Sequence, residues 1–68
     1  MTVNRIVCAK EGSNVFLRPK KSTEAGFLTR VPVGETVQVD EDDGTWSHVR
    51  WHAWSGYMMS RFLYDPDA

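Results

Sequence analysis

The stretch Gly44–Leu63, GTWSHVRWHAWSGYMMSRFL, decides the fold of this chain. It holds all three tryptophans and both histidines of a sequence of 68 residues. Each tryptophan brings a large apolar surface and an indole N–H that needs a hydrogen-bond partner. The rings therefore either build the core or form a platform for a ligand. Which of them are buried decides where a function can lie.

Alternation within this stretch predicts a half-buried strand over Trp46–His52, because successive strand side chains point to opposite faces. One face carries Ser47, Val49 and Trp51, and the other carries Trp46, His48, Arg50 and His52. A tight connection at Ala53–Gly56 leads to another strand at Tyr57–Met59. A single 3₁₀ turn is expected at Ser60–Phe62, before a short end at Leu63–Tyr64.

Outside this stretch, short apolar runs separated by turn residues predict further strands, and no segment shows sustained helical periodicity. These strands are expected at Thr2–Ala9, Val15–Arg18, Phe27–Val31 and Glu35–Glu41. The composition of Pro19–Gly26 indicates an ordered surface loop. Five or six short strands in so small a chain enclose a core only if the sheet curls into a barrel or a tight orthogonal sandwich. The predicted fold class is therefore all-β.

The length allows one domain, which we place at residues 1–64, followed by a flexible tail at residues 65–68. The formal net charge is -1, so no broad attraction to nucleic acid or to an anionic membrane is expected. Two small charged groups are most simply solvated turn residues. They are Arg18 with Lys20 and Lys21, and Glu41 with Asp42 and Asp43. No apolar run reaches the length of a membrane span, and the N-terminus lacks the pattern of a secretory signal.

Side chains with catalytic or metal-binding chemistry are few. Cys8 is the only cysteine, and its place in an ordinary strand predicts a packing role rather than a reactive thiol. His48 and His52 lie four residues apart on a predicted strand, about 13 Å, too far for one zinc ion to bridge. No Ser-His-Asp set with credible proximity can be named. The sequence therefore predicts no enzyme, no metal site and no cofactor.

The first predicted strand raises the question of oligomeric state. Its apolar residues Val3, Ile6 and Val7 form an edge that either closes the barrel or pairs with a second copy of the chain. Both possibilities are compatible with the sequence, so the oligomeric state is left open.

A series of short motifs runs along most of the chain. They are NVFLR at Asn14–Arg18, LTRVPVGETV at Leu28–Val37, GTWSHV at Gly44–Val49, SGY at Ser55–Tyr57, and FL at Phe62–Leu63. This series resembles the bacterial Src-homology-3 (SH3-type) family, whose members show an L-N-V-R-like strand, a K-G-T-like turn, a G-W-x-x-V strand and a G-Y/W-V-x-x-x-Y-L ending. The resemblance covers Arg5–Leu63 and implies a small SH3-like barrel of five to six strands.

The resemblance also implies non-catalytic recognition, because these modules occur beside bacterial and phage cell-wall hydrolases. The expected ligand is a peptidoglycan peptide or another peptide segment, bound in an aromatic groove as a means of cell-wall targeting. The alternative is a stand-alone small protein, for instance phage-encoded, that binds and modulates a protein partner or a small ligand. Location follows the same division: the cytoplasm if the chain is complete, and the cell wall if it is a domain excised from a hydrolase.

The resemblance places the groove between the loop Pro19–Gly26 and the hairpin Trp46–Tyr57. We expect Trp54 to lie at the tip of the hairpin, where a large ring has little core to enter. Contact with a ligand and simple isolated exposure are equally open for it. Phe16 is either buried by a barrel that covers both faces of its strand or exposed for a partner.

Polar anchors complete the expected site. Arg18 and Glu24 flank the groove, and Tyr57 can offer its hydroxyl while its ring packs inward. We expect Trp46 mainly to cap the barrel, and contact with a ligand is the second possibility for it. The full set of candidate ligand-binding residues is Trp54, Tyr57, Phe16, Arg18, Glu24, Trp46 and His52.

Overall fold

The computed structural model describes residues 2–10 and 12–66, which form seven short strands and one 3₁₀ turn. The strands are β1 (Val3–Val7), β2 (Asn14–Leu17), β3 (Thr29–Pro32), β4 (Thr36–Asp42), β5 (Trp46–Trp51), β6 (Trp54–Met59) and β7 (Leu63–Tyr64), and the 3₁₀ turn is η1 (Ser60–Phe62). The predicted all-β, SH3-like fold is confirmed, with the two-residue β7 added to the five or six strands expected. The position of η1 is also confirmed.

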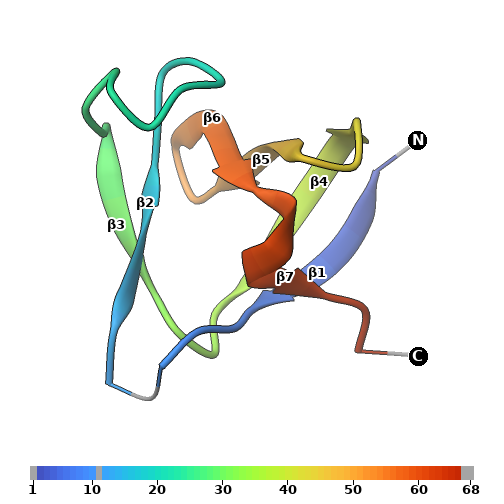
Figure 1. The fold of residues 1–68 in the computed structure, drawn as a ribbon. Coiled ribbons are helices and arrows are strands. Elements are labelled where there is room, and N and C mark those ends of the chain that lie inside the picture. Colours follow the sequence, from blue (N-terminus) through green and yellow to red (C-terminus); the bar gives the residue numbers. More distant parts are fainter. Residues whose placement is uncertain (1, 11, 67–68) are drawn as a thin grey trace.

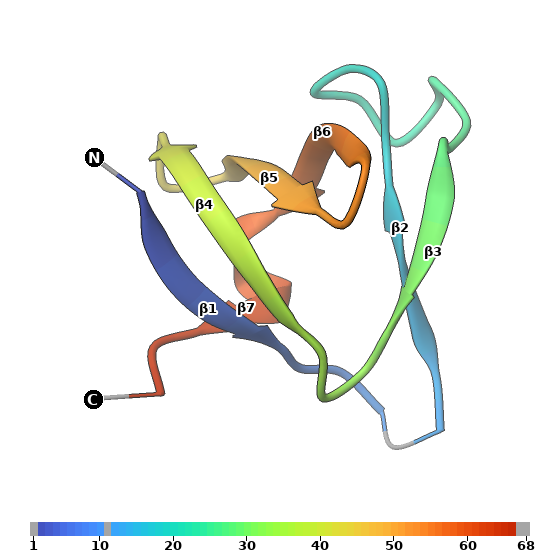
Figure 2. The ribbon, with the colours of Figure 1, turned by 180° about the vertical axis from the view of Figure 1, so that it is seen from behind.

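The strands pair antiparallel in two sheets. The larger sheet has the order β6-β5-β4-β1-β7, and the smaller one pairs β2 with β3. Figure 1 shows the β2–β3 ribbon at one side of the molecule while the larger sheet curls around the other side. Figure 2, the view from behind, shows β4 running diagonally across the near side of the molecule from the turn that follows β3. A bridge between Arg18 and Tyr57 joins the end of β2 to β6, where the two sheets meet.

The core lies between the two sheets and follows from the alternation of strand residues. In β2, Val15 and Leu17 face inward while Phe16 between them is 38% exposed. The fully enclosed apolar residues are Val7, Val15, Leu17, Val31, Val37, Val39, Val49 and Met58. No aromatic ring of the described residues belongs to this set, although Trp51 and Phe62 pack against it. Valines thus fill the barrel, and the large rings lie at its margin or on its surface.

Two strand boundaries differ from the predictions in ways that move candidate residues. β6 begins at Trp54 rather than at Tyr57, because His52 takes a positive φ of 54° and the ladder continues up to the pair Trp51 and Trp54. Trp54 therefore lies in a strand beside the turn, and the prediction that it occupies the tip was wrong. The other boundaries agree with the predicted ones within two residues.

The start of β3 is the second difference. The strand begins at Thr29, whereas Phe27 and Leu28 precede it in the long loop. Leu28 donates its N–H to the carbonyl of Leu17 at 2.6 Å, and the ring of Phe27 stacks on Phe16. Phe27 therefore covers the outside of β2, whereas the side chain of Leu28 lies near Gly56 in β6.

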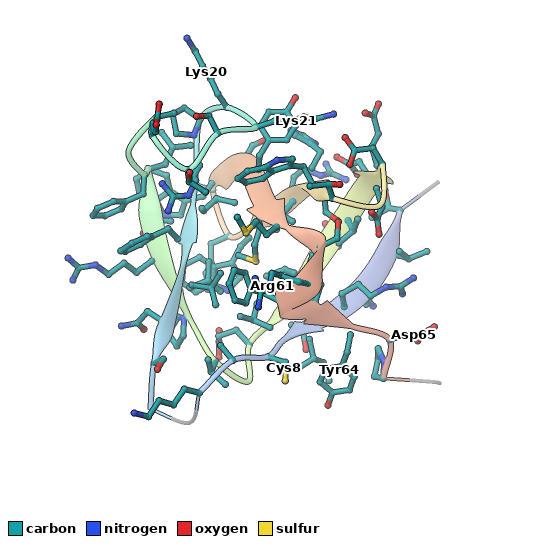
Figure 3. The ribbon with its side chains drawn as sticks, viewed as in Figure 1. Cys8, Lys20, Lys21, Arg61, Tyr64 and Asp65 are labelled. Atoms are coloured by element: carbon teal, nitrogen blue, oxygen red, sulfur yellow. The ribbon has the colours of Figure 1, made fainter. Side chains whose placement is uncertain are left out.

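Cys8 does not pack in the core, which corrects the sequence prediction. The side chain is exposed, while Val7 before it is 1% exposed and Ala9 after it packs against the core. Figure 3 shows Cys8 pointing away from the barrel at the bottom of the view. Neighbouring side chains point to opposite faces, so Cys8 faces solvent because Val7 and Ala9 on either side of it face the core.

β1 pairs with β4 on one side and with β7 on the other, so the first strand is an inner strand of the larger sheet and not its edge. The tail predicted at residues 65–68 begins with Asp65, whose carboxylate lies 3.9 Å from the guanidinium of Arg5. Residues 67 and 68 lie outside the described part of the chain, and the flexibility of the tail stays a prediction. Among the described residues, no helix has the length and apolar character needed to cross a membrane.

Candidate functional site

Three surface hollows involve the candidate residues. The β2–η1 hollow, of about 150 Å³, is lined by Ala9, Asn14, Val15, Phe16, Arg18, Met59 and Phe62. The loop hollow, of about 100 Å³, is lined by Lys21, Glu41, Asp42, Asp43, Trp46, His48 and Tyr57. The sheet hollow, of about 430 Å³, is lined by Asn4, Glu35, Thr36, Gln38, Arg50, Trp51 and His52. The seven candidate residues are therefore spread over the surface and do not share one groove.

The β2–η1 hollow lies between two elements that present phenylalanine rings. β2 supplies Phe16, and η1 supplies Phe62. Ser60 fixes the start of η1, because its hydroxyl donates to a carboxylate oxygen of Asp42 at 2.8 Å. Arg61 follows, with its guanidinium 5.5 Å from the centre of the Phe62 ring, and Figure 3 shows it in the middle of this face of the molecule. The walls of the hollow are thus mostly apolar, with positive charge at the rim.

A second ring pair extends this surface over the outside of β2. The rings of Phe16 and Phe27 are stacked, with centroids 4.4 Å apart and an angle of 12° between their planes. The guanidinium of Arg18 lies 5.3 Å from the centre of the Phe16 ring, and that of Arg30 lies 5.3 Å from the centre of the Phe27 ring. Cation–π contacts of this kind are favourable and leave the charge accessible. The side chains of Phe16 and Arg18, both predicted site residues, therefore lie together.

Hydrogen bonds hold both the side chain and the backbone of Arg18. Its Nη1 donates to the carbonyl oxygens of Thr23 at 2.9 Å and of Gly26 at 3.0 Å, so the side chain also anchors the long loop. Its backbone N–H and C=O exchange hydrogen bonds with Tyr57 at 2.8 and 2.7 Å. The long, flexible side chain is thereby fixed in one position at the edge of the β2–η1 hollow, which reduces the entropy lost when it binds a ligand.

The loop hollow is closed by a contact between the long loop and the turn before β5. Lys21 Nζ donates to Asp43 Oδ2 at 3.0 Å and lies 5.6 Å from the centre of the Tyr57 ring. Asp43 also accepts the backbone N–H groups of Trp46 at 2.7 Å and Thr45 at 2.9 Å. These two backbone bonds, with the bond from Lys21, lower the pKa of the Asp43 carboxyl to about 2, and the bond to Asp43 raises the pKa of Lys21. Both side chains remain exposed, as predicted for turn residues, and they also pair with each other.

This arrangement predicts a pH dependence of stability. The folded pKa of Asp43, about 2, is below the value of 3.8 for the unfolded chain, so its stabilising contribution is present above about pH 4 and is lost as pH falls toward 2. Asp43→Asn should lower the melting temperature at pH 6 and flatten its fall between pH 4 and pH 2. Melting curves followed by circular dichroism measure this. Glu24→Gln, in the exposed loop, is the matched control, and equal acid slopes for wild type and Asp43→Asn would contradict the assignment.

The remaining candidates stand apart from these two hollows. Trp54 is 42% exposed in β6, opposite Trp51. Glu24 is exposed in the long loop, where its N–H donates to Ser22 Oγ at 3.2 Å. His52 lines the sheet hollow, and its ring meets that of Trp51 edge-on at 4.5 Å. Ligand contact by Trp54, Glu24 and His52 stays a prediction.

The structure brings together an Asp-His-Ser set that the sequence analysis failed to name. His48 Nδ1 lies 3.1 Å from Asp40 Oδ2, and its Nε2 lies 3.1 Å from Ser55 Oγ. The strands β4, β5 and β6 are neighbours, so their outward side chains meet in a row. Asp40 is shared, because it also accepts bonds from Thr2 at 3.0 Å and from Arg50 at 3.2 Å. The statement that no such set exists was therefore wrong.

Of the three residues in this row, His48 lines the loop hollow. A catalytic triad needs a cavity for substrate and donors aimed at the developing oxyanion. Neither Asp40 nor Ser55 lines any of the three hollows. The hydrogen bond from Thr2 and the contacts with His48 and Arg50 lower the pKa of Asp40, as expected of a carboxylate in a surface network. We assign the row to cross-strand stabilisation. Within residues 2–10 and 12–66, no group of three or more metal-ligating side chains is placed to hold an ion.

Sequence reasoning missed several residues of the β2–η1 hollow. Met59 was predicted in the strand Tyr57–Met59 and Phe62 in the 3₁₀ turn, and neither was named as a site residue. Phe27, whose ring stacks on Phe16 outside the lining of the hollow, was predicted as a strand residue. The motif FL at Phe62–Leu63 gives a weak signal, because it marks two apolar residues that pack at the margin of the core. No sequence pattern predicts the stack of Phe27 on Phe16. It depends on how the 11-residue connection between β2 and β3, residues 18–28, folds back.

Comparison with known proteins agrees with this architecture. A family model described as the bacterial SH3 domain matches residues 13–64, from the turn before β2 to the end of β7. No curated protein and no solved structure shows a significant match to the chain. The matched region includes both sheets, the long loop and η1, and members of this family are in general non-catalytic binding modules. The chain therefore belongs to the bacterial SH3 domain family.

Proposed function

We propose that this domain binds an extended peptide in the β2–η1 hollow, and that a peptidoglycan peptide is the ligand. The observation that carries the proposal is the hollow itself, about 150 Å³ with mainly apolar walls. A cavity of about this volume accepts a group the size of benzene. Ligand sites are typically apolar pockets with a few placed polar groups, and Arg18 and Asn14 supply such groups here.

The open edge of β2 supports the binding of an extended chain. Backbone groups two residues apart in a strand face the same side. Because the N–H and C=O of Arg18 bond to Tyr57 in β6, those of Phe16 face the same side, toward the hollow and away from β3. An extended peptide can therefore pair its backbone with Phe16 while a side chain enters the hollow, as in recognition by strand addition.

The choice of peptidoglycan rests on the family to which the chain belongs, whose members accompany cell-wall hydrolases. A segment of another protein, bound by a stand-alone domain, is the alternative ligand for the same hollow.

Co-sedimentation with purified peptidoglycan sacculi tests this function. Wild-type domain should pellet with sacculi, and Phe16→Ala should reduce the retained fraction several-fold. Phe27→Ala is the matched control: it removes the same ring stack, but Phe27 does not line the hollow, so most retention should persist. Circular dichroism melting confirms that both variants fold.

The outcomes separate the parts of the proposal. No retention of the wild type would exclude the cell-wall ligand. If Trp54→Ala removes the retention and Phe16→Ala leaves it intact, the site lies at the β5–β6 hairpin. That result would contradict the assignment of the ligand to the β2–η1 hollow.

A further inference from the structure

We propose that the peptide in the β2–η1 hollow carries a carboxylate, which Arg18 binds, next to an apolar side chain that fills the hollow. This inference rests on the proposed peptide-binding function and adds the chemistry by which a ligand is selected.

The guanidinium of Arg18 has one edge engaged and one edge unused. A guanidinium has five N–H donors. Both hydrogen bonds that Arg18 makes to the carbonyls of Thr23 and Gly26 come from Nη1. Among the described residues, no acceptor lies on its Nε or Nη2. These two nitrogens form the fork that matches the two oxygens of a carboxylate, the bidentate geometry of the strongest ion pairs.

Arginines that lie against phenylalanine rings carry the positive charge of this surface. Arg18, Arg30 and Arg61 each contact a phenylalanine ring, and none of them forms an ion pair among residues 2–10 and 12–66. Among residues 2–10 and 12–66, no acidic side chain lines the hollow. The acidic residues of this part of the fold, Asp42 and Asp43 among them, line the loop hollow instead. In a chain of net charge -1, this separation produces a local positive field that attracts an anionic ligand.

The apolar walls specify the second half of the ligand. Phe16, Met59 and Phe62 surround a space of about 150 Å³, which suits one leucine-sized or aromatic side chain. Arg18 lines the same space, so the carboxylate and the apolar group have to lie close together in the ligand. A C-terminal apolar residue satisfies this requirement, and so does an aspartate or glutamate next to an apolar residue.

Titration of isotope-labelled domain with short acetylated peptides, followed by amide NMR shifts, tests the inference. The first probe is acetyl-glycyl-glycyl-leucine with a free carboxylate, and the second is the same peptide as its amide. A third, acetyl-glycyl-aspartyl-leucyl-glycine amide, carries the carboxylate on a side chain. We expect the free acid to bind about tenfold more tightly than the amide, with shifts at Phe16 and Met59. The third probe separates a terminal carboxylate from a side-chain one.

Arg18→Lys should abolish the difference between acid and amide, because an ammonium cannot form the bidentate contact. Arg50→Lys is the control, since Arg50 pairs with Asp40 on the outer face of the larger sheet. The comparison of acid with amide uses wild-type protein, so it holds even if Arg18→Lys loosens the long loop. Equal affinity of acid and amide, with shifts at the hollow, would overturn the carboxylate assignment and leave peptide binding standing.

Two further results would also count against the inference. If none of the three peptides shifts amides around the hollow, both the carboxylate assignment and the peptide-binding function fail. If oligothymidine shifts Phe16 and Arg30 while the acid peptide does not, the rings and guanidinium groups bind phosphate and bases, and the peptide assignment is overturned.

Discussion

Gly56→Ala is expected to destabilise the domain by about 3 kcal/mol, the upper part of the range for inserting an atom into a packed interior. A methyl group at this position would lie 2.5 Å from the backbone carbonyl oxygen of Arg18, with Leu28 Cδ1 at 3.1 Å and Leu17 Cγ at 3.2 Å. The leucines can shift, but the carbonyl belongs to the bridge between Arg18 and Tyr57 that joins the two sheets. The new methyl therefore forces the sheets apart.

Urea unfolding followed by tryptophan fluorescence measures this effect. Ser55→Ala, one residue earlier in β6 and on the exposed face, is the control and should cost under about 1 kcal/mol. If Gly56→Ala has the same unfolding midpoint as wild type, β2 and β6 do not approach as closely as described, and the position of Arg18 at the hollow is wrong.

Leu17→Ala should cost about 2 to 5 kcal/mol, the range for truncating a buried leucine. Leu17 is 0% exposed, lies at the end of β2 and contacts the space beside Gly56. A domain of this length has a total stability of about 3 to 10 kcal/mol, so this single change removes a large part of it. Loss of the native near-ultraviolet signal at 37 °C is the expected result.

Leu28→Ala is the matched control for this substitution. Leu28 has the same side chain, is 39% exposed, and lies near the same glycine. Its truncation should cost about 1 kcal/mol in proportion to the smaller area it buries. Equal losses for the two leucines would mean that the core is centred outside β2, in disagreement with the structure.

The fold was largely predictable from the sequence, because local alternation determines which side chains face inward. Val15 with Leu17 in β2, and Val37 with Val39 in β4, have the inward orientation that period-two patterning predicts. The 3₁₀ turn was also predicted at the correct residues. These features depend on neighbours in sequence, and sequence patterns describe such neighbours well.

The site was harder to predict, since it depends on contacts between segments far apart in the chain. Phe16 and Phe62 line the same hollow although they are far apart in the sequence, and no periodicity indicates that they meet. Asp40, His48 and Ser55 meet because three strands lie in register, with a bulge between Val39 and Glu41. The register of neighbouring strands is not encoded by the residue types alone.

The tryptophans illustrate the same limit. Trp51 packs against the core and donates its indole N–H to Glu35 at 3.3 Å, so it is a structural residue. Trp46 is half-buried beside the loop hollow, and Trp54 is exposed in β6. The concentration of large rings in one stretch correctly indicated the hairpin on which the barrel is built. The rings that line the β2–η1 hollow and support the proposed binding site are instead those of Phe16 and Phe62.

Amide and indole NMR shifts of the labelled domain, recorded with soluble peptidoglycan stem peptides, test the central claim most directly. We predict the largest changes at Phe16, Arg18, Met59 and Phe62, with the indole N–H signal of Trp54 unchanged. Changes concentrated at the Trp54 indole, with the four residues around the β2–η1 hollow unaffected, would contradict the account.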